Sequence, residues 1–238
     1  MRDDQATGLR RLFARRAPRP LGVGGDDATG VVVELALAMA ELGTQVLVVD
    51  RTRGAAAVQL GLRARFELAH VLAGDLALET VLLDGPPGVT VLPAARGLDE
   101  LALAARSTAG GWQAQLAAQL AAAGREADVW LVNGLPPTGS DADVLLAIRP
   151  TARAVTGAYV QMKALATLRG QRAFGVIVDR ASSDTAARAA YAGLADVARR
   201  FLSADLAYRG HVPGGAAQQR RAAFLHLAHA LLPAPAHP

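Results

Sequence analysis

The 238 residues fit one α/β domain with a sizeable core or at most two small domains, and a hydrophobic fraction of 52% excludes a disordered protein. Cysteine is absent, which excludes disulfides and thiolate metal sites, and no apolar run approaches the roughly 20 residues that a membrane-spanning helix needs. The formal net charge of +4 indicates an ordinary basic surface, and with only 4% aromatic residues for stacking we expect no specific nucleic-acid site.

The first residues predict a short amphipathic helix on a tether. Over residues 3–16, the apolar side chains of Ala6, Leu9 and Phe13 recur at helical spacing, and arginines cover the remaining surface. Prolines in the stretch that follows end the helix and act as a stiff linker. The pattern divides the chain into an N-terminal helix (1–17), a linker (18–20), an α/β domain (21–232) and a tail (233–238).

The α/β domain alternates short apolar strands with helices. A continuous apolar run over residues 45–50 that ends on an acid is typical of a buried parallel strand, and the strongly apolar residues 31–42 predict the helix before it. Further strands are predicted over residues 21–23, 89–92, 129–133, 144–148, 174–179 and 206–211, and further helices over residues 98–106, 112–123, 155–169 and 185–202. This alternation predicts a mainly parallel, doubly wound sheet of about six to eight strands with helices on both faces.

The first strand–helix turn is where a ligand site is expected, because ligands of open parallel sheets bind at the carboxyl ends of the strands. A phosphate-binding loop there needs glycines for close backbone approach, a lysine for the phosphates, and a Ser or Thr for Mg²⁺. This turn has glycines and a threonine but no lysine, and two aspartates stand in their midst. Its residues are Gly22, Gly24, Gly25, Asp26, Asp27, Ala28 and Thr29.

This turn and the helix LALAMAELG after it resemble the first βαβ unit of the MinD/ParA ATPases, whose loop reads GKGGVGKT. Aligned from that helix, the two lysines of the family fall on Val23 and Ala28, and its last loop glycine falls on Asp27. The resemblance implies a P-loop α/β fold of the MinD/ParA type. It also implies that Thr29 and three glycines are all that remains of the ATP loop.

Further positions depart from the site of that family. After the second strand the family has Asp-Ala-Asp, whose second Asp helps to place the attacking water, and this chain has Asp50, Arg51 and Thr52. The Mg²⁺-linked Asp of the family motif DTGAG corresponds to Asn133, and the adenine-contacting Asn corresponds to Asp179. The helix that follows DTGAG in the family is expected to be mostly deleted here.

Electrostatics indicates what these departures do to ATP binding. Replacing a lysine by an aspartate environment near a triphosphate turns attraction into repulsion, and a unit charge pair about 4 Å apart is worth roughly 4 kcal/mol at an effective dielectric constant of about 20. We therefore expect binding of MgATP to be lost or weak, no catalytic residues, and no metal site or other cofactor. The alternative is a weak ATPase in which Arg51 or Arg53 replaces the missing lysine.

Other segments narrow the resemblance to one branch of this class. Residues 60–101 resemble the pattern GLRPRYTLADVLAG…LEDVLLDGPAGLKVLPGGSGLEEL of the FlhG/FleN regulators of flagellar number, and the similarity extends over nearly the whole chain up to about residue 213. The N-terminal segment matches the family motif DQAxxLR at each defined position. The matching residues are Asp4, Gln5, Ala6, Leu9 and Arg10.

The resemblance implies a non-hydrolytic regulator of flagellar number or placement that works through protein partners. Members of the family act partly on the GTPase FlhF, which their DQA-bearing helix stimulates, and they contact flagellar transcription factors and components of the C-ring. We therefore expect residues 1–17 to bind an FlhF-like GTPase. One alternative is a helix packed on its own domain, with Leu9 and Phe13 covered, and another is a basic membrane or nucleic-acid adaptor unrelated to flagella.

The segment 222–232 predicts an amphipathic C-terminal helix, because Phe224, Leu227, Ala228 and Leu231 fall on one face. In MinD-like proteins such a helix can lie on a membrane, which would place this cytoplasmic protein at the inner face of the cell membrane. The alternative is that the helix closes the core of the domain.

Overall fold

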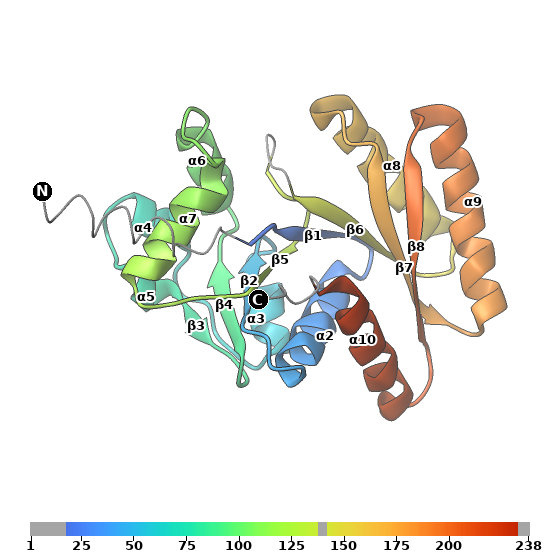
Figure 1. The fold of residues 1–238 in the computed structure, drawn as a ribbon, viewed down its shortest axis with the longest axis horizontal. Helices are drawn as coiled ribbons and strands as arrows, with labels where there is room; N and C mark the ends of the chain where they lie inside the picture. The colour runs from blue at the N-terminus through green and yellow to red at the C-terminus, as the bar shows by residue number, and fades with distance from the viewer. Residues whose placement is uncertain (1–17, 138–141, 233–238) are drawn as a thin grey trace, which may run out of the picture.

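The computed structural model describes residues 18–137 and 142–232, so the predictions for residues 1–17 and 233–238 lie outside the described residues (Figure 1). In the described part, eight strands form one sheet in the order β3-β4-β2-β5-β1-β6-β7-β8. Neighbouring strands are parallel except β3 and β4, which are antiparallel. The strands are β1 (Leu21–Gly25), β2 (Val46–Asp50), β3 (Leu83–Asp84), β4 (Val89–Pro93), β5 (Val129–Asn133), β6 (Asp143–Ile148), β7 (Ala173–Ala181) and β8 (Asp205–Pro213).

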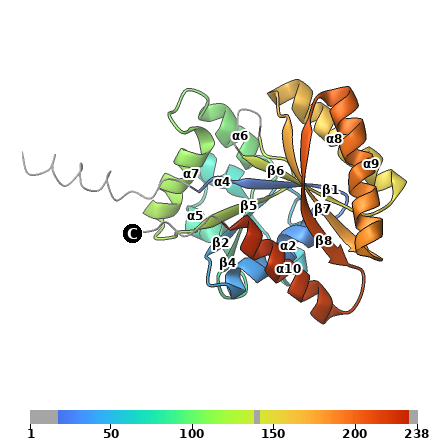
Figure 2. The ribbon, with the colours of Figure 1, turned by 45° about the vertical axis from the view of Figure 1, so that its right-hand side comes forward.

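Helices cover both faces of this sheet (Figure 2). They are α2 (Ala28–Glu41), α3 (Ala55–Gln59), α4 (Leu68–Leu72), α5 (Leu78–Val81), α6 (Gly97–Ala104), α7 (Gly111–Ala122), α8 (Ala152–Arg169), α9 (Asp184–Leu202) and α10 (Ala217–Leu231). The doubly wound, mainly parallel sheet that the sequence predicts is therefore confirmed.

One face of the sheet is covered by α2, with α3 and α10 beside it. Val32, Leu35 and Met39 of α2 are at most 1% exposed, and they pack against side chains of the central strands such as Val48 and Leu131. The predicted packing of this helix on the sheet is confirmed. It fixes the first turn of α2 at the carboxyl edge of the sheet, next to the ends of β2 and β5.

The C-terminal helix α10 closes the same core. Phe224, Leu227 and Ala228 are buried, and Leu227 lies over Gly210 of β8, where a side chain would come within 2.9 Å of it. The apolar face of α10 is thus used inside the domain, in agreement with the second of the two hypotheses for this segment. In the described residues, no helix has both the length and the apolar character needed to cross a membrane.

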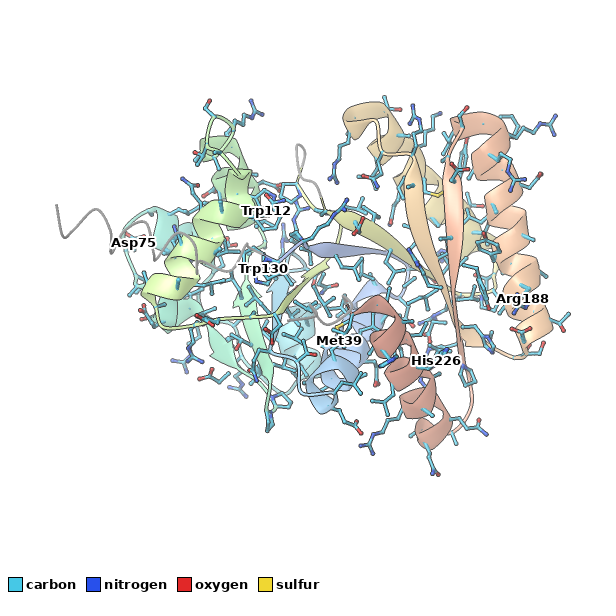
Figure 3. All side chains as sticks on the ribbon, viewed as in Figure 1. Met39, Asp75, Trp112, Trp130, Arg188 and His226 are labelled. Atoms are coloured by element: carbon cyan, nitrogen blue, oxygen red, sulfur yellow. The ribbon has the colours of Figure 1, made fainter. Side chains whose placement is uncertain are left out.

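The opposite face carries two separate groups of helices. The helices α4 to α7 lie over β2, β4 and β5, whereas α8 and α9 lie over β6, β7 and β8. In the first group, Trp112 of α7 and Trp130 of β5 face one another, with ring centroids 6.0 Å apart (Figure 3). Side chains of each inner strand therefore alternate between two cores, as strands buried on both faces require.

The structure adds elements that the sequence does not predict, namely α3, α4, α5 and β3. Each has five residues or fewer, too few for a helical or strand period to emerge from the sequence. Between β5 and β6 the described residues, 134–137 and 142, contain no helix. The expected shortening of the chain after β5 is consistent with this.

Candidate functional site

The Gly-rich turn lies at the carboxyl edge of the sheet between β1 and α2, where the sequence places it. It lines a cavity of about 370 Å³, whose far wall includes Gln161 of α8. Two of its glycines are required by packing. A Cβ at Gly22 would lie 2.4 Å from the ring of Pro136, and Gly25, at φ +110°, would place a Cβ on the carbonyl oxygen of Ala147. The glycines therefore have a structural role in this turn.

The side chain of Gln161 reaches from α8 into the turn. The backbone N–H of Gly25 donates a hydrogen bond to its Oε1 at 2.9 Å, and a Cβ at Gly24 would come within 2.6 Å of the same oxygen. Backbone N–H groups of such a turn are what a phosphate-binding loop presents to its ligand. Here one of them is used within the protein.

A buried polar cluster, which we call the Asn133 cluster, joins the ends of β2 and β5 to the first turn of α2. It consists of Thr29, Asp50, Thr52 and Asn133, and Asp50 and Asn133 are 0% exposed. The Nδ2 of Asn133 lies 3.2 Å from the Thr29 hydroxyl, 3.0 Å from Asp50 Oδ1 and 2.9 Å from the Thr52 hydroxyl. The Thr29 hydroxyl in turn lies 3.3 Å from Asn133 Oδ1.

Donors from the protein surround the carboxylate of Asp50 in this cluster. Its Oδ1 accepts from the backbone N–H of Thr52 at 2.9 Å and from the Thr52 hydroxyl at 2.5 Å. Its Oδ2 accepts from the backbone N–H of Ala56, in the first turn of α3, at 3.0 Å. A buried carboxylate with these partners is stabilised without a cation, because each of its oxygens receives a hydrogen bond.

A second cluster lies on the other side of the turn, and we call it the arginine–aspartate cluster. Its members are Asp26, Asp27, Asp179, Arg149, Arg180 and Arg220. Asp27, at the N-cap position of α2, lies 3.2 Å from the guanidinium of Arg149 and 3.4 Å from that of Arg180. Asp26 accepts from the backbone N–H of Arg149 at 3.3 Å. The aspartates of the turn are therefore tied to the ends of β6 and β7.

Asp179, at the end of β7, is 0% exposed and extends this cluster to α10. Arg220 donates to Asp179 Oδ1 at 3.0 Å and to the carbonyl oxygen of Pro213 at 3.0 Å. Arg180 lies 3.5 Å from the other oxygen of Asp179 and has a positive φ of 55°, unusual for a residue with a side chain. Charged residues at the ends of α2, β6, β7 and α10 thus meet in one cluster, and the end of β8 adds a carbonyl oxygen.

The two carboxyl groups of this cluster have opposite pKa shifts. Burial and the neighbouring Asp27 raise the pKa of Asp179 above its ordinary value, although Arg220 opposes the shift. Burial alone would also raise the pKa of Asp27, but hydrogen bonds from Asp179 and Arg149 outweigh it and hold that pKa below its ordinary value. Burial and Asp27 therefore disfavour the charged form of Asp179, whereas the partners of Asp27 favour its charged form.

The two arginines considered as substitutes for the missing lysine lie outside the cavity above the turn. Arg51 donates to the carbonyl oxygen of Leu135 and, at 2.6 Å, to Asp99 of α6. Arg53, at φ 55°, lines a different cavity together with Phe66. The structure thus gives both arginines surroundings other than the Gly-rich turn.

The structure brings to one edge of the sheet seven cluster residues that the sequence names as positions of a degenerate site: Asp26, Asp27, Thr29, Asp50, Thr52, Asn133 and Asp179. The sequence does not single out Gln161, Arg149, Arg180 or Arg220. Arg149 and Arg180 directly follow predicted strands, so their positions in the sequence could have marked them as site residues. Gln161 lies within a helix, and nothing in the sequence marks it.

Among residues 18–137 and 142–232, no three His, Asp or Glu side chains gather as metal ligands. The motif residues Asp4, Gln5, Ala6, Leu9 and Arg10 lie outside the described residues.

Comparisons with known proteins show which proteins are similar to this chain. No protein-family model matches it. It is 34% identical over 203 residues to the antiactivator FleN of Pseudomonas aeruginosa strain PAO1, a similarity that covers 81% of this chain and 71% of that protein. Its fold is similar to the MinD cell division protein of Aquifex aeolicus, with a TM-score of 0.65 and 19% identity, covering 90% of this chain and 96% of that one. It is also similar to cobyrinic acid a,c-diamide synthase of Mycobacterium smegmatis with bound ADP and magnesium, with a TM-score of 0.61 and 24% identity, covering 90% and 94% of the two chains.

The structural similarities lie below 25% identity and therefore establish the fold, which is that of the MinD/ParA P-loop proteins. The sequence similarity to FleN covers more than two thirds of both chains and establishes the narrower relationship. The chain belongs to the FlhG/FleN family of flagellar regulators within the MinD/ParA class.

Proposed function

We propose that this protein is a non-hydrolytic regulator of flagellar number or placement that acts through protein partners. The observation that supports the proposal is that side chains of the protein itself bond to residues of the Gly-rich turn and to the polar residues around it. The Asn133 cluster, the Gln161 contact and the arginine–aspartate cluster together engage the turn from three sides. A regulator of this kind would have the MinD/ParA scaffold without its nucleotide switch.

The residues at the magnesium position do not fit that ion. Mg²⁺ prefers oxygen ligands in octahedral geometry, and the related ATPases supply a loop Ser or Thr hydroxyl and an Asp. In this chain the aspartate position holds Asn133, whose amide nitrogen points at Asp50 and at two hydroxyls. A cation placed among these groups would meet N–H donors instead of free oxygens. We infer that magnesium binding is lost or weak.

The residues at the phosphate and adenine positions do not fit ATP either. Asp27 replaces the last loop glycine, and its carboxylate engages Arg149 and Arg180, so these cations are already paired within the protein. The Gly25 N–H is already bonded to Gln161. At the position that corresponds to the adenine-contacting Asn of the family, Asp179 is paired with Arg220, which also bonds the carbonyl oxygen of Pro213. A nucleotide would have to break these contacts in order to bind.

Titration calorimetry with MgATP and MgADP tests this part of the proposal. We expect no saturable heat at nucleotide concentrations up to about 1 mM, because that limit corresponds to a binding free energy weaker than about −4 kcal/mol. The MinD protein of Aquifex aeolicus, measured in parallel, serves as the positive control. A dissociation constant in the low micromolar range, or dimerisation driven by ATP, would show that the loss of nucleotide binding proposed here is wrong.

For the partner, we propose an FlhF-like GTPase that the N-terminal segment stimulates. The support is the match to the DQAxxLR motif at each defined position, on a short basic segment joined to the domain by a Pro-rich linker. A helix on such a tether can dock in a groove of a partner while the domain stays in place. The related protein of Pseudomonas aeruginosa is an antiactivator, so a flagellar transcription factor is a further candidate partner of the domain.

A peptide of residues 1–20 is expected to raise GTP hydrolysis by the cognate FlhF-like protein. Replacing Gln5 and Leu9 by alanine should abolish the stimulation, because both side chains belong to the motif. Thr7→Ala, at an undefined position of the same motif, is the matched control and should leave the stimulation intact. The measurement is phosphate release per minute with the peptides and with the full chains. If the double substitution lowers the melting temperature of the full chain while the peptide has no effect on the GTPase, the segment is structural.

A further inference from the structure

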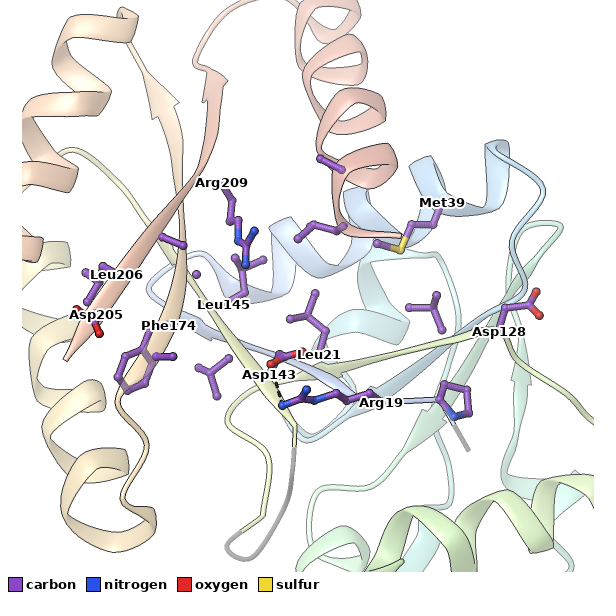
Figure 4. A pocket seen from close by; sticks show the side chains of 18 residues that line it. Arg19, Leu21, Met39, Asp128, Asp143, Leu145, Phe174, Asp205, Leu206 and Arg209 are labelled. Atoms are coloured by element: carbon purple, nitrogen blue, oxygen red, sulfur yellow. Dashed lines mark ion pairs between the residues drawn. The ribbon is translucent and has the colours of Figure 1, made fainter. Parts of the chain in front are cut away.

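The edge of the sheet opposite the Gly-rich turn carries a groove of about 580 Å³, which we call the amino-edge groove (Figure 4). Its floor includes one cross-strand row of side-chain positions: Leu145 of β6 pairs with Gly175 of β7, which pairs with Ala207 of β8. Leu21 of β1 continues the floor on the neighbouring strand. Three of these four residues are apolar, of which Leu145 is buried, and the side chain of Arg209 lies beside the fourth, Gly175, where a Cβ would come within 3.3 Å of it.

The groove lies where the helical cover of this face stops. Met39, in the last turns of α2, and Leu231, at the end of α10, line its wall, so both helices end beside it. Leu21 and Leu231 are partly exposed, and Ala207 is exposed. A sheet face of this kind is normally buried by a helix, because apolar positions left in water forfeit the free energy of their burial.

We propose that the amino-edge groove binds the chain's own N-terminal segment, residues 3–16, when no partner holds it. The segment is attached at the mouth of the groove, since Pro18 lines it and Arg19 forms an ion pair of 3.2 Å with Asp143 on its rim. Only a few residues separate this anchor from the apolar positions Leu9 and Phe13. A tether this short gives an effective concentration in the millimolar range, so a weak contact suffices for docking.

Charge and shape both favour this occupant. The segment has arginines on its polar surface. The groove is lined by three carboxylates, Asp128, Asp143 and Asp205, and by two guanidinium groups, Arg19 and Arg209, which leaves an excess of one negative charge. As a helix, residues 3–16 would be about 21 Å long and would present one apolar stripe to the floor. The C-terminal tail, residues 233–238, is also joined to the domain near the groove, at the end of α10. Three of its six residues are proline, which disfavours a helix.

Docking in the groove and binding to a partner exclude one another, and this consequence rests on the proposed function. Leu9 belongs to the partner motif and also lies at the centre of the apolar stripe. A single Leu9 side chain cannot lie in both places. The groove therefore keeps the segment away from weak partners, and a GTPase must compete with the groove for it.

Disulfide trapping in the full chain tests the docking itself, and the absence of native cysteine makes the experiment clean. The test variant combines Phe13→Cys with Ala207→Cys, because Phe13 lies on the apolar stripe but outside the partner motif. The matched control combines Arg11→Cys with Ala207→Cys, because residues 11 and 13 have nearly the same tether but lie about 200° apart around a helix. We expect the test pair to form an intramolecular disulfide at least tenfold faster than the control pair, measured by mass spectrometry after timed oxidation.

Equal rates for the two pairs, or disulfides formed mainly between chains, would overturn the proposal. No GTPase is needed for this measurement, so its result is independent of the proposed function. The segment can dock in the groove without stimulating a GTPase, and it can stimulate a GTPase without docking in the groove. In a second step, the oxidised test variant is expected to lose at least tenfold of its stimulation of the GTPase and to regain it on reduction. If the locked chain stimulates as well as the reduced chain, the groove does not compete with the partner.

Discussion

Replacing Asn133 by aspartate is expected to destabilise the protein by about 3 kcal/mol, although the two side chains have nearly the same shape. Asn133 and Asp50 are both 0% exposed, and the amide nitrogen lies 3.0 Å from Asp50 Oδ1. The substitution removes that donor and places two carboxylates at this distance in a buried site. It also removes the donor to the Thr52 hydroxyl, which lies at 2.9 Å. For a chain of this size the melting temperature should fall by roughly 6–12 °C.

A charge swap provides the control for this prediction. In the double variant Asp50→Asn/Asn133→Asp the cluster again contains one amide and one carboxylate, so we expect it to recover more than half of the lost stability. Recovery should be incomplete because Asp50 accepts from three groups besides Asn133. Thermal and urea denaturation of the three proteins give the comparison. If Asn133→Asp is as stable as the parent, the cluster has room for a second carboxylate, and Asn133 is no sign of a lost magnesium site.

The sequence predicts the sheet well because runs of apolar residues mark its strands. The run ending at Asp50 is continuously apolar, and a strand buried on both faces has no other simple pattern. The region of α3, α4 and α5 is different, because each helix has five residues or fewer. Isolated helices of that length have almost no intrinsic stability, so tertiary packing decides that they form. The periodicity of the sequence therefore does not predict these short helices.

The site is predictable in part for a topological reason. Thr29, Asp50 and Asn133 each stand near the carboxyl end of a strand, and parallel strands bring these ends to one edge. What the sequence cannot give is the set of partners. Gln161 is 136 positions from Gly25, and Arg220 is 41 positions from Asp179. Those contacts depend on how α8 and α10 are rotated against the sheet, which is fixed by the whole core.

Replacing Arg220 by alanine is expected to destabilise the protein by about 2–3 kcal/mol near neutral pH. Arg220 is the nearest cation to the buried Asp179, at 3.0 Å, and its guanidinium also lies 5.6 Å from the centre of the Phe224 ring. Its loss leaves a buried carboxylate with Arg180 alone, at 3.5 Å. Arg221→Ala is the matched control. It removes the next residue of α10, whose exposed ion pair with Glu41 is expected to contribute nothing measurable.

The pH dependence distinguishes this mechanism from simple loss of packing. The pKa of Asp179 already lies above its ordinary value because of burial and Asp27, and Arg220 holds it down, so Arg220→Ala should raise it further. A group whose pKa is raised on folding supports stability below its unfolded pKa, and that support is lost as the pH rises through the folded pKa. The pKa of Asp27 is lowered in the parent, and Arg220 is not among the causes of that shift, so the substitution acts first on Asp179. We therefore expect the stability gap between Arg220→Ala and the parent to be small at about pH 4 and full at about pH 8. Urea denaturation across this range measures it, and a gap that does not change with pH would mean that Arg220 acts through its contacts with Phe224 and Pro213 and not through Asp179.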